Sequence, residues 1–171
     1  MTNAPLLEVK NLEVSFPLNN GQFRAVSDFS FSLEAGKTVG LVGESGSGKS
    51  LTALSLLRLI PKPGIISKGE INFNGENVLT LPDDKMRAIR GRKISMIFQE
   101  PMTALNPVLT VGAQIAEALL IHTEISPAQA HQKAVEMLDR VGIPDAAARA
   151  LDYPHNLSGG MRQRAVIAMA L

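Results

Sequence analysis

Polar and apolar positions alternate along the first part of the chain and take helical spacing along the last part. Alternation predicts strands at 7–16, 23–26, 29–33 and 69–75, with a turn at Asn19–Gly21. A strand with one polar face is typical of an antiparallel sheet that is solvated on one side. The first part of the chain is therefore expected to contain an antiparallel layer.

Two short runs, 38–42 and 93–98, are apolar almost throughout, and we expect them to form buried parallel strands. An apolar helix should follow the first run and stop before Pro61. Spacing, proline positions and caps predict helices at 51–60, 82–90, 111–121 and 126–141, and a short alanine-rich turn or helix at 144–151. Ser126 should cap the fourth of these helices, with Pro127 at its first position. The fold class expected is α/β.

The spacing of apolar residues changes near Gln99 from a pattern typical of strands to one typical of helices. We therefore expect a mixed β region with a nucleotide-binding core at 1–100 and a helical subdomain at 101–171. No internal repeat or low-complexity segment divides the chain further.

The stretch between the run 38–42 and the helix after it fits the pattern G-x-x-x-x-G-K-[ST] of a phosphate-binding P-loop. Its glycines let successive N–H groups point at an anion, and the helix N-terminus adds positive potential. Lys49 should reach the β- and γ-phosphates, and the Ser50 hydroxyl should ligate Mg²⁺. The residues expected at the phosphates are Gly43, Glu44, Ser45, Gly46, Ser47, Gly48, Lys49, Ser50 and Leu51.

Composition narrows the class of protein. Among 171 residues, 17 basic and 16 acidic side chains give a net charge of +1, which provides no electrostatic argument for nucleic-acid binding. The sequence has no cysteine, so disulfides and cysteine-based metal sites are excluded. No apolar run is long enough for a membrane span, and the N-terminus does not resemble a signal peptide. We expect a soluble, intracellular protein.

A second stretch can bind anions. Ser158 can cap a helix, and Gly159 and Gly160 place bare N–H groups at the positive end of that helix. Alone, such a turn is a weak indication of a ligand site. Its combination with a P-loop and with the basic residues Arg162 and Arg164 is more specific.

With both stretches in view, the whole chain resembles the nucleotide-binding domain of ABC transporters. It is most similar to the ATP-binding subunits of bacterial peptide, nickel and glutathione importers. Gly43–Ser50 corresponds to the Walker A motif, Gln99 to the Q-loop glutamine and Leu157–Met161 to the signature, with Met161 in place of the commoner Gln. The stretches 98–112 and 153–155 are also similar to the peptide-importer forms.

The resemblance implies a RecA-like P-loop core, an antiparallel β subdomain, a helical subdomain and ATP hydrolysis with Mg²⁺. Gln99 would contact Mg²⁺ or the attacking water and act as a hinge. Phe16 would stack on the adenine, although an aromatic residue in an alternating strand is more often core. Ser158, Gly159 and Gly160 would close on ATP held by a second subunit in a head-to-tail dimer.

The resemblance also implies partners and a location. They are a second ATP-binding subunit (identical or not), transmembrane permease subunits and, indirectly, a substrate-binding protein, with no nucleic acid. The subunit would lie peripherally at the cytoplasmic face of the bacterial inner membrane and drive uptake of peptides or a related small solute.

The family's Walker B strand, which ends in Asp-Glu, and its switch histidine do not occur in this sequence. His155 precedes the signature and does not match the switch, and we expect His122 and His131 to be surface residues. We therefore expect the N-terminal portion of a longer protein, which alone neither sustains hydrolysis nor folds with full stability.

The sequence is also compatible with other classes of protein. An ABC-type ATPase of DNA repair or chromosome architecture usually carries a coiled-coil or zinc insertion, and neither is found. A P-loop kinase or GTPase would lack the signature. An interaction protein that binds nucleotide without hydrolysing it also fits the sequence.

Overall fold

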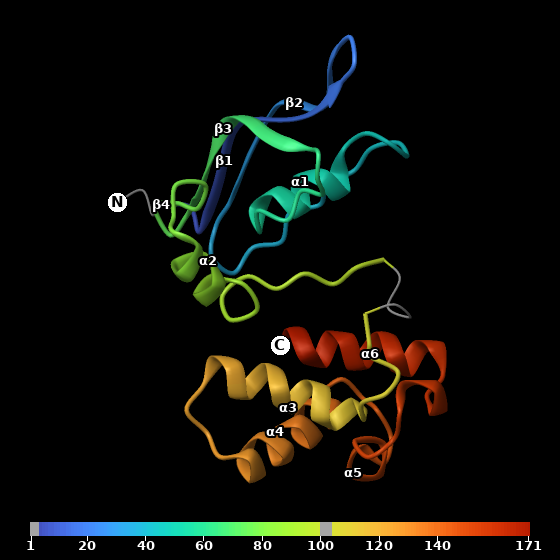
Figure 1. The fold of residues 1–171 in the computed structure, drawn as a ribbon. Helices are drawn as coiled ribbons and strands as arrows, with labels where there is room; N and C mark the ends of the chain where they lie inside the picture. Colours follow the sequence, from blue (N-terminus) through green and yellow to red (C-terminus); the bar gives the residue numbers. More distant parts are fainter. Residues whose placement is uncertain (1–3, 100–103) are drawn as a thin grey trace. The chain divides into compact units, whose positions relative to one another are not determined.

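The computed structural model describes residues 4–99 and 104–171, and the chain divides into two compact units, Met1–Arg87 and Ala88–Leu171. Each unit has its own packing and is described by itself (Figure 1). The division falls inside the helix α2, Asp83–Ile89. The boundary expected near residue 100 concerns functional subdomains and stays a prediction.

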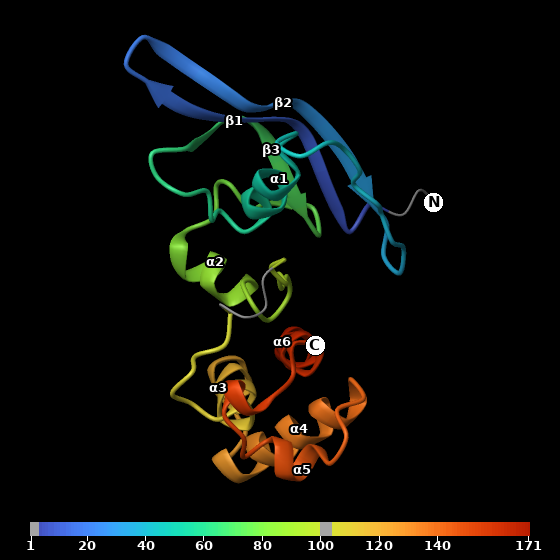
Figure 2. The same cartoon turned by 90° about the vertical axis from the view of Figure 1, so that its right-hand side faces the viewer.

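The first unit contains an antiparallel sheet with the strand order β2-β1-β3-β4 (Figure 1). Its strands are β1 (Leu7–Leu18), β2 (Gly21–Leu33), β3 (Ile65–Phe73) and β4 (Glu76–Asn77). Figure 2 shows β1 and β2 running side by side as one long hairpin. The antiparallel layer predicted from alternation is confirmed.

One strand prediction is wrong in detail, because β2 runs without a break where two short strands were expected. Besides an extra residue at Ala25 of β2, register shifts place one on β1 near Asn11 and another on β2 near Asp28. Asn11 and Asp28 adopt positive φ, at 47° and 50°, and the Asn11 side-chain amide donates to Asp28 Oδ1 at 2.7 Å. The bulges near Asn11 and Asp28 offset each other, and the one at Ala25 shifts the register by one residue toward the hairpin turn.

The helix α1, Lys49–Leu56, packs against β1 and β2 and ends four residues earlier than predicted. Arg58 adopts the left-handed conformation with φ 53°, and the Leu59 N–H donates to the Leu54 carbonyl at 2.9 Å. The Arg58 N–H donates to the Ser55 carbonyl at 3.0 Å, which completes a Schellman-type end. The Arg58 guanidinium also donates to the Leu81 carbonyl at 2.7 Å, so a tertiary contact supports this early stop.

Both predicted parallel strands are absent from the described part of the chain. Residues 38–42 belong to no strand, and Val42 is 90% exposed. Residues 93–98 form only one isolated bridge, between Arg90 and Ile94. A parallel strand needs a neighbouring strand to pair with and cover on both faces, and the four described strands belong to a different, antiparallel sheet.

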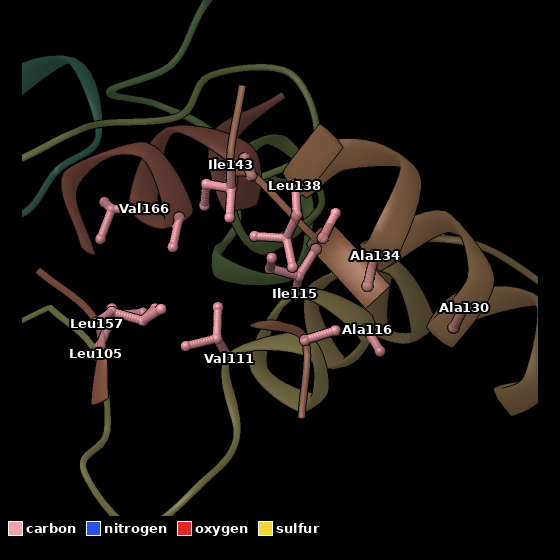
Figure 3. Close-up of a cluster of buried hydrophobic side chains, with 14 residues drawn as sticks. Leu105, Val111, Ile115, Ala116, Ala130, Ala134, Leu138, Ile143, Leu157 and Val166 are labelled. Atoms are coloured by element: carbon pink, nitrogen blue, oxygen red, sulfur yellow. The ribbon is translucent and has the colours of Figure 1, made fainter. Parts of the chain in front are cut away.

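The second unit is helical, as predicted. Its elements are α3 (Val111–His122), α4 (Pro127–Arg140), α5 (Ala146–Arg149), the 3₁₀ helix η2 (Pro154–Asn156) and α6 (Gly159–Ala170). Apolar side chains from α3, α4 and α6 meet in one core, where Ile115, Leu138 and Val166 point inward (Figure 3). Within the described residues, no helix is long and apolar enough to cross a membrane.

The cap predicted for the fourth helix is confirmed. The Ser126 hydroxyl accepts a hydrogen bond from the Gln129 N–H at 3.3 Å, and the Gln129 side chain accepts from the Ser126 N–H at 2.9 Å. Together they form a reciprocal capping box with Pro127 in the first turn. Of the two histidines expected at the surface, His131 is exposed and His122 is half-buried.

Candidate functional site

The loop Gly43–Ser50 leads directly into α1, as its sequence predicts. Gly46 and Gly48 adopt φ values of 81° and 88°, in the region that favours glycine. Gly48 is the N-cap of α1 and provides no side chain there, so the first turn of the helix presents backbone N–H groups rather than a side-chain cap. Such a helix start favours a bound anion.

Gly48 also lies tightly against the sheet. A Cβ at this position would be 2.7 Å from the Ala25 carbonyl oxygen and 2.9 Å from Val26 Cγ2. Both of these atoms belong to β2. The loop therefore touches the strand through its backbone, and only glycine allows this approach.

The Lys49 ammonium turns back over its own loop. It donates to the Gly43 carbonyl at 2.7 Å, the Glu44 carbonyl at 2.6 Å and the Ser47 hydroxyl at 3.2 Å. These contacts hold a positive charge at the mouth of the loop, where the phosphates of a nucleotide would lie. A cavity of about 260 Å³ opens beside it and is lined by Gly43, Ser47, Lys49 and β2 residues near Ala25.

The residues present fit a triphosphate with Mg²⁺. The loop offers bare backbone donors and one ammonium, and the Ser50 side chain is exposed at the helix start. In the described residues, no cluster of three His, Cys, Asp or Glu side chains gathers to hold a metal ion alone.

The second predicted anion element lies in the other unit. The Ser158 hydroxyl caps α6 by accepting from the Met161 N–H at 3.3 Å. Gly159 and Gly160 are exposed, and a Cβ at either would meet nothing within 4 Å. Leu157, 2% exposed, anchors this turn in the helical core. The turn is firmly held while its glycine backbone faces solvent.

For two predicted site residues, the structure gives the position but does not test the expected role. Gln99 is an exposed residue of the second unit, and its role as a Mg²⁺ or water contact stays a prediction. Phe16 is half-buried, and its ring atoms come within 2.6 Å of the position that a Cβ would take at Gly64. Its role at the adenine also stays a prediction. The stretch similar to peptide importers includes residues 100–103, which lie outside the described residues.

Sequence reasoning missed two residues. The sequence pattern places Phe23 in a short strand, and the structure adds that it is 57% exposed and lies directly opposite Phe16. The pattern places Gln114 in a helix, and the structure adds that it is buried and binds the backbone of the preceding loop. Alternation alone could not identify either, because each depends on a specific partner, Phe16 for Phe23 and the Asn106 backbone for Gln114.

Comparison with known proteins agrees with the class that these two sites define. The model of the family described as ABC transporter matches residues 26–171, and the chain belongs to that family. A putative peptide import ATP-binding protein of Brucella abortus is 51% identical over the whole chain, which covers 52% of that protein. The oligopeptide transport ATP-binding protein OppD of Escherichia coli is 51% identical over 97% of the chain, which covers 49% of OppD.

Solved structures agree on the fold. The ATP-binding cassette MJ0796, solved as a dimer in a post-hydrolysis state with ADP and Pi, has a TM-score of 0.83 and 27% identity. The match covers 96% of this chain and 68% of that one. The α/β cassette fold predicted from the sequence is therefore confirmed. The chain spans about half the length of the curated relatives that it matches.

Proposed function

We propose that this chain is part of the ATP-binding subunit of a bacterial ABC importer, and that ATP binding and hydrolysis there drive uptake of peptides or a related small solute. The observation that carries the proposal is the loop Gly43–Ser50, which packs against β2 at Gly48 and is capped by the Lys49 ammonium. The identity of about one half to peptide import proteins over the whole chain supports the solute class. This similarity to import proteins does not favour an ATPase of DNA repair.

In this proposal the loop N–H groups and the α1 N-terminus hold the phosphates, and Lys49 pairs with the β- and γ-phosphoryl oxygens. The Ser50 hydroxyl and Gln99 hold Mg²⁺, which neutralises charge that develops on the phosphates. Gln99 also orients the water that attacks the γ-phosphate. Phe16 contributes an aromatic surface for the base.

A second ATP-binding subunit completes the site. Ser158, Gly159 and Gly160 present a helix N-terminus to solvent, and in a head-to-tail dimer they would approach the γ-phosphate bound by the partner. Each chain then contributes half of two composite sites. The dimer of the cassette MJ0796 supports this arrangement by similarity.

The second unit also offers a surface for permease subunits. The N–H groups of Val111 and Gly112 donate to the carbonyls of Asp152 and Ala150, so the loop before α3 lies beside the segment after α5. Exposed apolar side chains gather on these two segments, and they are Val108, Leu109, Leu151 and Tyr153. Apolar side chains on an ordered surface are typical of a protein contact. The subunit would then lie peripherally at the cytoplasmic face of the inner membrane, with a substrate-binding protein delivering solute to the permease.

Uptake of a labelled peptide into cells or vesicles tests the proposal. The protein, supplied in its full-length form with its permease, should support uptake that depends on ATP, and Lys49→Ala should abolish it. A permease-independent ATPase that DNA stimulates would contradict the proposal. ATP binding without hydrolysis or uptake in the full-length protein would favour an interaction protein instead.

A further inference from the structure

The hairpin of β1 and β2 carries two aromatic side chains in one cross-strand pair. The register joins Phe16 directly to Phe23, and residues directly opposite each other share a face of the sheet. Their Cβ atoms in such a pair lie about 4.5–5.5 Å apart. The two rings therefore form neighbouring parts of one surface.

This surface is on the face that meets the P-loop. Val14 and Phe16 are two positions apart on β1 and so point to the same side. The partner of Val14 on β2 is Val26, whose Cγ2 lies 2.9 Å from the position of a Cβ at Gly48. The P-loop and the aromatic pair thus share one face of the hairpin.

The two rings differ in how much of them is covered. Phe16 is half-buried because its ring edge fills the space beside Gly64, where Ile60 also packs. Phe23 is 57% exposed. The partners of Val26 and Phe23 on β1, Val14 and Phe16, are two residues apart, so the aromatic pair lies about 7 Å along the hairpin from the Val26 side chain beside Gly48.

We propose that Phe23 contacts the base of the bound nucleoside triphosphate and, with Phe16, forms a platform of two aromatic rings. The inference rests on the proposed function, since it takes the phosphates to be in Gly43–Ser50. A nucleotide held there by its phosphates can lay its base along the hairpin, with one ring beneath it and the other at its edge. Stacking on an aromatic ring tolerates any base, so the platform serves ATP and GTP alike.

Titration of the protein with ATP, GTP and inorganic triphosphate tests this inference. Phe23→Ala should weaken the affinity for both nucleotides by about tenfold, the loss typical of one base–aromatic contact. Its affinity for inorganic triphosphate, which has no base, should not change. Phe23→Trp should retain nucleotide affinity.

Ile65→Ala is the matched control. Ile65 is 53% exposed on the same sheet, but its partner Ser15 points to the opposite face from Phe16. This variant should bind ATP normally.

The outcomes separate the two proposals. Unchanged ATP affinity in Phe23→Ala, alongside a loss in Lys49→Ala, overturns the aromatic platform and leaves the P-loop function intact. An equal loss of triphosphate affinity in Phe23→Ala also overturns it, because Phe23 would then act through the loop and not the base. A wild-type protein that binds neither ATP nor triphosphate overturns both.

Discussion

Two hydrogen bonds, one in each direction, join the side-chain amide of Gln114 and the backbone of Asn106. Gln114 Oε1 accepts from the Asn106 N–H at 2.8 Å, and Gln114 Nε2 donates to the Asn106 carbonyl at 3.0 Å. Nε2 also donates to the Leu109 carbonyl at 3.0 Å. One buried side chain thus holds the loop that presents Val108, which is 74% exposed.

Replacing Gln114 by Leu should lower the free energy of unfolding by about 1–3 kcal/mol, because backbone groups of Asn106 and Leu109 lose their partner. Urea unfolding followed by circular dichroism measures this. Gln132→Leu, at an exposed position of α4, is the control and should stay within about 0.5 kcal/mol of the wild type. Equal stability of the two variants would show that the amide bonds do not hold the loop.

Lys49→Ala should weaken ATP binding at least about tenfold. Removal of the ammonium takes away a charge-assisted contact worth about 1.5–3 kcal/mol. Isothermal titration calorimetry gives the affinity, and Lys133→Ala, an exposed lysine of α4, controls for the loss of one charge. If Lys49→Ala bound ATP as tightly as the wild type and Lys133→Ala do, the P-loop role would be contradicted.

Gly159→Leu should leave ATP binding to the monomer intact and block ATP-dependent dimerisation. A Cβ at Gly159 meets nothing within 4 Å, so the variant should fold, while its side chain would occupy the approach to the partner's γ-phosphate. Size-exclusion chromatography of the full-length protein with ATP measures the dimer. Gln163→Leu, exposed one turn further along α6, should dimerise normally. Normal dimerisation and turnover of Gly159→Leu would rule out the composite site.

Glu13 should make stability sensitive to acid. The Ser67 hydroxyl donates to its carboxylate at 2.8 Å and, with Arg24 and Lys68 nearby, holds the pKa of Glu13 below its ordinary value of 4.5, although burial opposes this. A lowered pKa in the folded state means that the stabilisation is present above pH 4.5 and is lost as the pH falls through the lowered pKa.

The free energy of unfolding should therefore fall more steeply on acidification below pH 4.5 in the wild type than in Glu13→Gln. Urea unfolding at a series of pH values gives both curves. Glu70→Gln, at an exposed glutamate of β3, should keep the wild-type slope. Parallel curves for the wild type and Glu13→Gln would mean that this carboxylate has no net preference for its folded surroundings.

The sequence predicts the parts of this fold that depend on neighbours along the chain. The cap at Ser126 and the one at Ser158 follow from residues three positions apart, and both form as expected. The P-loop is equally local, since its glycines and the helix after it are contiguous. Its role in binding is a prediction that the titration above addresses.

What the sequence could not predict depends on pairing between distant segments. An apolar run such as 38–42 has the composition of a buried strand, but a strand forms only where a neighbour supplies hydrogen bonds. The pairing of Phe23 with Phe16 depends on the register between two strands, which alternation along either strand does not fix. The early end of α1 likewise depends on the contact between Arg58 and Leu81, 23 positions apart.

Because Gly48 contacts Ala25, the phosphate loop can move more easily in one direction than in the other. On one side it meets the carbonyl of Ala25, at a register shift of β2, and the residues Gly43–Ser47 are exposed on the other. Close-packed backbone yields little, so a loop that widens around an incoming anion must expand toward solvent. Any force that it exerts inward is applied to β2 at Ala25, two residues from Phe23. The strand that limits the loop at Ala25 is therefore also the strand that carries Phe23 near the tip of the hairpin.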